Sequence, residues 1–275
     1  MLDEKRVLLE KKVMVSKNTG GKEALRCGLA EGSRIRLIGL GGIGCIVLHH
    51  LALFLNSLNL PLRLTLVDGD AFEPRNAERM HFDTLGNKAE VKAKETAVLI
   101  GRSDVMVVPV PEYLSPDNIA RLIGAGDHVM LCVDNHPTRR LVSEHCQTLS
   151  DVVLFSGGND GVAPPREQGT YGNVQVAIRR DGRDVTVPIT RYHPEIARAE
   201  GEGPGKEGCG QLVESVPQIQ FTNLMAASWM LSAFFAYSCG CLEYQEVKFD
   251  ILEGRALPQF PLEPGAVVKP IPVLD

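Results

Sequence analysis

Short apolar runs alternate with helix-length segments over the first 160 residues of the chain. Strands are predicted by runs rich in Ile, Leu and Val at residues 34–40, 62–68, 105–110, 129–134 and 152–155. The segments between them predict helices up to Leu55 and over residues 88–100, 116–123 and 138–149. Ser115 is the expected cap of the third helix. Strands that alternate with helices predict right-handed βαβ units and a parallel sheet covered on both faces.

The pattern changes after residue 160. Two β-type runs at 174–179 and 184–189 flank a Gly-containing turn and predict an antiparallel hairpin. Residues 196–211 are rich in Gly and charge and predict a mobile loop, which a long apolar helix and a strand over 247–252 follow. We therefore expect an α/β fold that is Rossmann-like and doubly wound, with a mostly parallel sheet and an antiparallel C-terminal extension.

This pattern also suggests how the chain is organised. Residues 1–33 form an N-terminal segment, and residues 34–160 form the Rossmann-like core of alternating strands and helices. Residues 161–256 supply the hairpin, the mobile loop and the long helix that complete the same domain. Residues 257–275 contain five prolines, which predict an extended tail.

The apolar run from Phe221 to Cys241 approaches the length of a membrane span. It contains Thr222, Asn223 and Ser228 and lacks basic flanks, so we interpret it as a buried core helix rather than a membrane segment. The charged N-terminus shows no signal-peptide pattern, which favours a cytoplasmic protein.

Net charge and cysteine content argue against some classes of ligand. A net charge of -5 gives no electrostatic reason to expect binding to nucleic acid or an anionic membrane. The seven cysteines are odd in number and form no CxxC pair. Reduced thiols are therefore expected, and no structural zinc.

A glycine motif, Gly39-Leu40-Gly41-Gly42-Ile43-Gly44, lies between the first predicted strand and helix. Glycines in this pattern allow a tight turn, a bare backbone and close packing of helix on strand, so that phosphate can approach the helix N-terminus. Because strand and helix are both predicted where the motif requires them, we interpret it as a nucleotide site.

Two acids, Asp68 and Asp70, end the second predicted strand. An acid at the position of Asp68 accepts hydrogen bonds from ribose hydroxyls, and a turn aspartate is the competing interpretation. Asp70 either faces the phosphates or holds the loop. A glycine motif and one acid are equally typical of oxidoreductases that bind NAD or FAD, so that class remains an alternative here.

Three polar residues after these acids favour a triphosphate instead. Asn76, Arg79 and Lys88 place cationic and amide groups near the glycine motif, where they can contact phosphates and stabilise a pyrophosphate leaving group. Asp134 ends the fourth predicted strand and is the candidate ligand of the Mg²⁺ that accompanies ATP. The competing role for Asp134 is to cap the helix that starts near Pro137, and it is able to do both.

Taken in order, Gly-x-Gly-Gly-x-Gly, Asp-x-Asp, Asn-x-x-Arg, Gly-x-Lys-Ala and Asp-Asn resemble the ThiF/MoeB/HesA family of ubiquitin-activating-like adenylyltransferases. The resemblance covers residues 34–160 and, more weakly, 213–237. It implies an enzyme that binds ATP and Mg²⁺, adenylates the C-terminal glycine carboxylate of a ubiquitin-like protein, and works as a homodimer. It also implies that Asp68 holds ribose, that Asn76, Arg79 and Lys88 contact phosphates, and that Asp134 supports magnesium.

The chain departs from the family pattern in several places. The N-terminal Arg-Tyr-x-Arg-Gln segment is missing, the usual Asn-Leu-x-Arg-Gln is Asn76-Ala77-Glu78-Arg79-Met80, and zinc-binding CxxC pairs are absent. These departures suggest a divergent, stand-alone bacterial-type member, and they leave a non-catalytic subunit of a heteromeric complex as a further alternative.

Two cysteines have different expected roles. Cys209 lies in the predicted mobile loop, where family members can place a thiol that receives the acyl group, and Lys206 would lower the pKa of that thiol. An unreactive loop thiol is the competing interpretation. Cys146 shares a helical pattern with Leu141, Val142 and Leu149 and is expected in the core.

Overall fold

The computed structural model describes residues 25–78, 80–102, 104–160, 168–199 and 219–260. Its helices and strands are β1 (Arg34–Ile38), α2 (Gly42–Ser57), β2 (Leu62–Val67), β3 (Ala71–Phe72), the 3-10 helix η1 (Pro74–Glu78), β4 (Gly86–Asn87), α3 (Lys88–Ile100), β5 (Val105–Val110), α4 (Ile119–Leu122), β6 (Asp127–Leu131), α5 (His136–Cys146), β7 (Val152–Asn159), β8 (Tyr171–Arg180), β9 (Arg183–Asp184), α6 (Ile189–Tyr192), α7 (Pro194–Ala197), α8 (Gln220–Ser238), β10 (Glu246–Asp250) and β11 (Arg255–Gln259).

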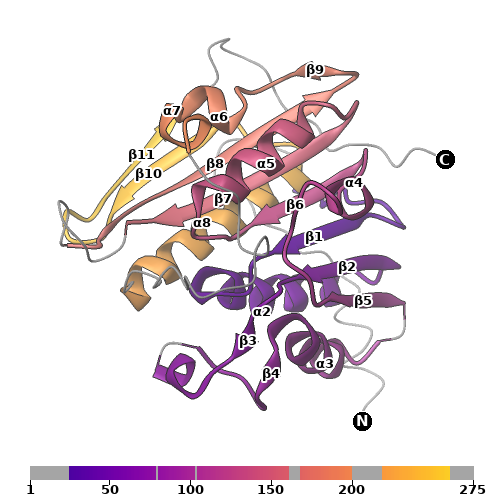
Figure 1. Cartoon of the computed structure of the whole chain (residues 1–275). Coiled ribbons are helices and arrows are strands. Elements are labelled where there is room, and N and C mark those ends of the chain that lie inside the picture. The colour runs from indigo at the N-terminus through magenta and orange to yellow at the C-terminus, as the bar shows by residue number, and fades with distance from the viewer. Residues whose placement is uncertain (1–24, 79, 103, 161–167, 200–218, 261–275) are drawn as a thin grey trace.

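One mixed sheet organises these elements, in the order β11-β10-β8-β7-β6-β1-β2-β5, and β9 pairs with β8 (Figure 1). The five strands from β7 to β5 are parallel. From β7 outward to β11, and at β9, every pairing is antiparallel. The sequence-based prediction of a mostly parallel sheet with an antiparallel C-terminal extension is confirmed.

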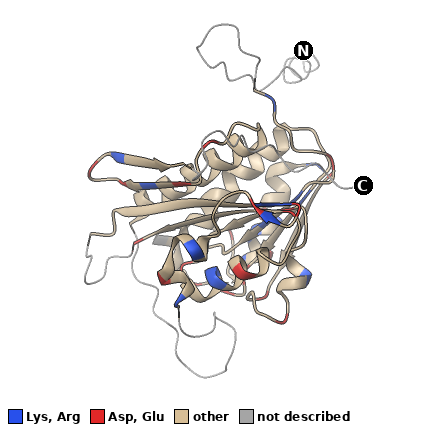
Figure 2. Ribbon diagram, turned by 90° about the horizontal axis from the view of Figure 1, so that it is seen from above, with Lys and Arg blue, Asp and Glu red and all other residues tan. Residues whose placement is uncertain are grey.

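Helices cover both faces of the sheet, as a doubly wound fold requires (Figure 2). One core packs α2, α3 and α8 on the sheet, and the other packs α4, α5 and α6 on the opposite face. Alternation along β6 shows the division, because Met130 belongs to the first core while Val129 and Leu131 belong to the second. Parallel strands buried on both faces read as continuous apolar runs, which is why they were visible in the sequence.

The long apolar helix is α8, and it packs on α2 and β7. Its buried face includes Met230, Phe234 and Tyr237, and the rings of the last two contact Phe155 edge-on. No helix in the described part of the chain has the length and apolarity needed to cross a membrane. The interpretation of this segment as a core helix is confirmed.

Two sequence-based element predictions were wrong in detail. The helix expected over 116–123 spans only Ile119–Leu122, and Asn118 rather than Ser115 stands at its N-cap. The Asn118 side chain instead accepts a hydrogen bond from the Ser115 N–H at 2.9 Å, which closes a turn before the helix. A side-chain bond inside the turn therefore shortens the helix.

The predicted antiparallel hairpin is confirmed by the pairing of β8 with β9, but its second strand, expected over 184–189, spans only Arg183–Asp184. The hydroxyl of Thr186 accepts from the Ile178 N–H and donates to the Val176 carbonyl, each at 2.8 Å. The Thr186 side chain thus hydrogen-bonds to backbone groups that a longer second strand would have paired with. Residues 257–259, expected in an extended tail, belong to β11, which pairs with β10.

Candidate active site

The glycine turn lies at the topological switch point of the sheet. β1 pairs with β2 on one side and with β6 on the other. After β1 the chain adds β2 and β5 on one side of the sheet, and it then crosses over to add β6 and β7 on the other side. In doubly wound sheets the crevice outside the carboxyl ends of the strands at this point is the usual ligand site. Asp68 and Asp134 follow β2 and β6 at this same edge.

The glycine turn is so tight that a Cβ on Gly39 or Gly44 would collide with the backbone. Gly39 has φ +88°, and a Cβ there would lie 3.0 Å from the Cys132 carbonyl carbon and oxygen. A Cβ on Gly44 would lie 1.9 Å from the Gly39 carbonyl oxygen. Among the residues that the structure describes, none would meet a Cβ on Gly41 within 4 Å, and none caps α2 with its side chain. The first N–H groups of α2 are therefore available to an anion.

The Asp68 side chain stabilises this turn by hydrogen bonds to its backbone. Its partly buried carboxylate accepts the Leu40 N–H at 2.6 Å and the Asp70 N–H at 2.8 Å. Burial raises the pKa of Asp68, and the nearby Lys88 ammonium opposes that shift. Asp68 thus has the turn role that was its competing interpretation. This role does not exclude a ribose contact, which stays a prediction.

Lys88 is anchored at the same edge by Asp70. Its ammonium lies 3.0 Å from one Asp70 oxygen, and the Tyr113 hydroxyl donates to the other. Asn87 caps α3 by accepting from the N–H groups of Ala89 and Glu90. Its amide also donates to the Asp68 and Asp70 carbonyls, each at 3.0 Å, so the start of α3 is tied to the end of β2.

Tyr113 was not singled out from the sequence. Burial and its hydrogen bond to Asp70 both raise its pKa, so the hydroxyl stays protonated and donates. Its position in the sequence could have indicated this contact, because Tyr113 follows the carboxyl end of β5 just as Asp68 and Asp70 follow that of the neighbouring strand β2. The structure thus gives Asp70 a clear role in positioning Lys88.

Apart from Asp134, the only remaining candidate among the described residues is Asn76. Asn76 is buried within η1, and its side-chain oxygen accepts the Glu73 N–H at 2.9 Å, which stabilises the local turn. Its contact with phosphate stays a prediction. Arg79, Cys209 and Lys206 lie outside the described residues, as do 200–211 of the predicted mobile loop.

Asp134 is exposed at the end of β6 and is not the cap of the following helix. Asn135 is the N-cap of α5, and its side chain accepts the Thr138 N–H at 2.9 Å. Among the residues that the structure describes, none forms a hydrogen bond or ion pair with the Asp134 carboxylate. The capping alternative is therefore wrong, and this carboxylate is available to a cation.

A buried arginine beside Asp134 was missed by sequence reasoning. The Arg139 guanidinium donates to the carbonyls of Val133 and Gly157, each at 2.8 Å, and to the Ser156 hydroxyl at 3.3 Å. Burial lowers the pKa of Arg139, and the negative charge of Asp134 acts in the opposite direction. A signal existed in the sequence, because Arg139 falls on the same helical face as Val142 and Cys146.

We expect Arg139→Ala to lower the free energy of unfolding by about 2–4 kcal/mol, because it leaves buried acceptors at the ends of β6 and β7 without donors. Arg140→Ala is the matched control, since Arg140 is only partly buried and donates to the Ala199 carbonyl. Urea unfolding of both variants measures the difference. Equal stabilities would contradict the role assigned to Arg139.

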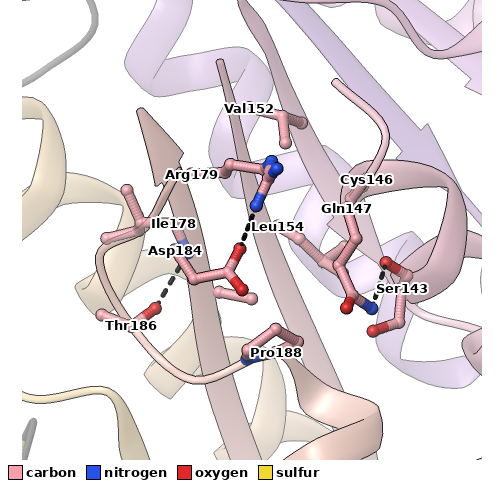
Figure 3. A pocket seen from close by; sticks show the side chains of 11 residues that line it. Ser143, Cys146, Gln147, Val152, Leu154, Ile178, Arg179, Asp184, Thr186 and Pro188 are labelled. Atoms are coloured by element: carbon pink, nitrogen blue, oxygen red, sulfur yellow. Dashed lines mark hydrogen bonds and ion pairs between the residues drawn. The ribbon is translucent and has the colours of Figure 1, made fainter. Parts of the chain in front are cut away.

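A small hollow between α5, β7 and β8 lies at the opposite edge of the sheet (Figure 3). It is lined by Val152, where β7 begins, and by Cys146, where α5 ends. The Arg179–Asp184 ion pair, at 2.6 Å, closes one side. Burial raises the pKa of Cys146 to about 12, so this thiol is a core group, as expected, and unsuited to nucleophilic chemistry.

Known proteins similar to this chain include several adenylyltransferases. The molybdopterin-synthase adenylyltransferase of Escherichia coli K12 is 31% identical over 139 residues, which are 50% of this chain and 51% of that protein. The adenylyltransferase and sulfurtransferase MOCS3 of Bos taurus is 35% identical over 114 residues, 41% of this chain and 24% of that protein. The chain thus spans at most about half the length of these relatives.

The fold is shared with solved structures as well. The crystal structure of E. coli MccB with ATP superposes with a TM-score of 0.57 and 15% identity, covering 87% of this chain and 67% of that one. A family model described as the ThiF family matches residues 23–247. That match covers most of the sequence and confirms the resemblance of its ordered motifs, so the chain belongs to the ThiF family.

Proposed function

We propose that this protein is an ATP-dependent adenylyltransferase that activates the C-terminal glycine carboxylate of a ubiquitin-like protein. The observation that carries the proposal is the set of contacts joining the glycine turn, Asp68, Asp70 and Lys88. It places a fixed cation beside an uncapped helix N-terminus, which suits a polyphosphate that loses pyrophosphate. The relatives named as adenylyltransferases support the same reaction class.

In the proposed reaction a carboxylate oxygen of the acyl substrate attacks the α-phosphorus of ATP. The bond from that phosphorus to the bridging oxygen breaks, and pyrophosphate leaves with the electron pair. The N–H groups at the start of α2 bind phosphate oxygens, and Lys88 stabilises the charge that develops on the leaving group. Asp68 retains free lone pairs beyond its two backbone bonds, so it is able to accept ribose hydroxyls too.

Asp134 is the residue that fits a magnesium ion. Magnesium on ATP needs only one or two carboxylates beside phosphate oxygens and water, and the Asp134 carboxylate is exposed and unpaired within the described chain. Within those residues no group of three or more His, Cys, Asp and Glu side chains is arranged to hold a metal ion. When bound, Mg²⁺ would draw charge from the phosphate oxygens.

Asp134→Asn is expected to raise the Mg²⁺ concentration needed for half-maximal ATP–pyrophosphate exchange by about tenfold or more, because a neutral amide binds the cation more weakly. Titration of the exchange rate with Mg²⁺ measures the shift. Asp181→Asn is the matched control: it removes the same charge from an exposed turn at the other edge of the sheet, where φ is 48° and Asn is tolerated. Identical titrations for Asp134→Asn and the unmodified chain would remove Asp134 from the metal site.

Ligand binding separates this proposal from its alternatives. A ligand that binds the native state raises the melting temperature, so ATP with Mg²⁺ should stabilise the chain and NAD should not. Stabilisation by NAD alone would favour an oxidoreductase. Weak ATP binding, with exchange appearing only after a second protein is added, would favour a non-catalytic subunit.

Several finer features of the proposal rest on the family resemblance. They are a homodimer, phosphate contacts from Asn76 and Arg79, and transfer of the acyl group to Cys209. A cytoplasmic location is proposed instead from the reduced thiols expected of the cysteines. Mass spectrometry after incubation with ATP and candidate ubiquitin-like proteins distinguishes a free adenylate from a Cys209 thioester. Size-exclusion chromatography with light scattering measures the oligomeric state.

A further inference from the structure

Asn223, in the first turn of α8, is a buried polar residue against the glycine turn. It is only 2% exposed, and its Nδ2 lies 2.4 Å from the place where a Cβ on Gly42 would stand. Its Oδ1 is fully buried and has no hydrogen bond from the described part of the chain. The preceding residue shows the usual arrangement, because the Thr222 hydroxyl donates to the Gly169 carbonyl at 2.9 Å.

The surroundings of Asn223 indicate a ligand rather than ordinary packing. Gly42 begins α2 and Asn223 lies at the start of α8, so the N-terminal ends of two long helices meet at this contact. No described side chain caps either helix, and no described residue fills the space beside Gly41. Buried acceptors in native proteins nearly always have a donor, so an orphaned one beside an open anion site calls for a donor on the bound molecule.

The chemistry of the proposed reaction identifies that donor. In the proposed reaction the triphosphate of ATP binds at the glycine turn and offers acceptors only, while the ribose hydroxyls are assigned to Asp68. The acyl substrate must bring its carboxylate to the α-phosphorus at the same place. In a polypeptide the carboxylate carbon is separated by a single atom from the nitrogen of the last peptide bond, so that N–H arrives next to the turn together with the reacting group.

We propose that Asn223 is a positioning residue for the acyl substrate, and that its amide turns toward the glycine turn when substrate binds, so that its Oδ1 accepts a hydrogen bond from the N–H of the last peptide bond. The inference rests on the proposed adenylation activity and adds a substrate requirement to it. The substrate is a polypeptide C-terminus whose final peptide nitrogen carries a hydrogen. A C-terminal residue that is N-alkylated would lose the contact.

The test uses two stable mimics of an acyl-adenylate, 5′-O-sulfamoyladenosine carrying an N-acetylglycyl or an N-acetylsarcosyl group. They differ by one N-methyl group, which removes the N–H. Calorimetric titration of the full chain should show about 5- to 10-fold tighter binding of the glycyl compound, the effect of one hydrogen bond. Asn223→Ala should bind both compounds equally.

Asn56→Ala is the matched control variant. Asn56 also has a buried Oδ1 without a hydrogen bond from the described residues, but it lies in the last turn of α2, away from the glycine turn. This variant should keep the preference for the glycyl compound. If the unmodified chain binds neither mimic nor ATP, the proposed function itself is wrong. If it binds both mimics equally, or if Asn223→Ala keeps the preference, only the role of Asn223 is wrong.

Discussion

Lys88→Ala is expected to slow ATP–pyrophosphate exchange by about 10²–10³-fold, the usual loss when one preorganised group that stabilises developing charge is removed. The Lys88 side chain is mostly buried, and its ammonium is held 3.0 Å from Asp70. Because burial and this contact restrict the ammonium before ATP arrives, little reorganisation is needed when negative charge develops on the leaving group.

Lys94→Ala is the control for Lys88→Ala. Lys94 lies on the same helix, α3, but is exposed, so its loss should leave exchange unchanged. Exchange is measured for both variants with the same ubiquitin-like substrate, and melting without ATP confirms that each variant folds. Normal exchange by a folded Lys88→Ala variant would contradict the proposed role of this cation.

Gly44→Ala is expected to lower the free energy of unfolding by about 3 kcal/mol or more. The added methyl group would stand 1.9 Å from the Gly39 carbonyl oxygen, which belongs to backbone rather than to a movable side chain. Relief requires α2 to move away from the end of β1. That movement would separate the helix start from Asp68, which holds the Leu40 N–H.

Gly41→Ala gives the matched comparison within the same turn. Its Cβ would meet none of the described residues within 4 Å, and its φ of -80° is ordinary for alanine, so stability should be nearly unchanged. The methyl group would instead project into the open space beside the turn and weaken ATP binding. Urea unfolding and calorimetric ATP titration of both variants check these expectations. A stable Gly44→Ala variant, or unimpaired ATP binding by Gly41→Ala, would show that the turn is built differently.

The antiparallel part of the fold was harder to predict than the parallel part. Strands buried on both faces form continuous apolar runs, and the glycine motif marks the turn after β1 from local sequence alone. In contrast, the ends of α4 and β9 depend on hydrogen bonds from Asn118 and Thr186 to backbone groups. Those bonds compete with helix and strand formation, and apolar periodicity does not reveal them.

Local pattern and the points where strands end were sufficient to predict the doubly wound core and the glycine turn, and to select Asp68, Lys88 and Asp134 as candidate site residues. That Asp70 and Tyr113 hold Lys88 in place became visible only in the folded chain, since these groups come from three separate segments. It also decided that Arg139 and Asn223 are buried beside the crevice. A buried polar residue in a helix acquires its role from the elements packed against it, and only the folded chain brings those elements near.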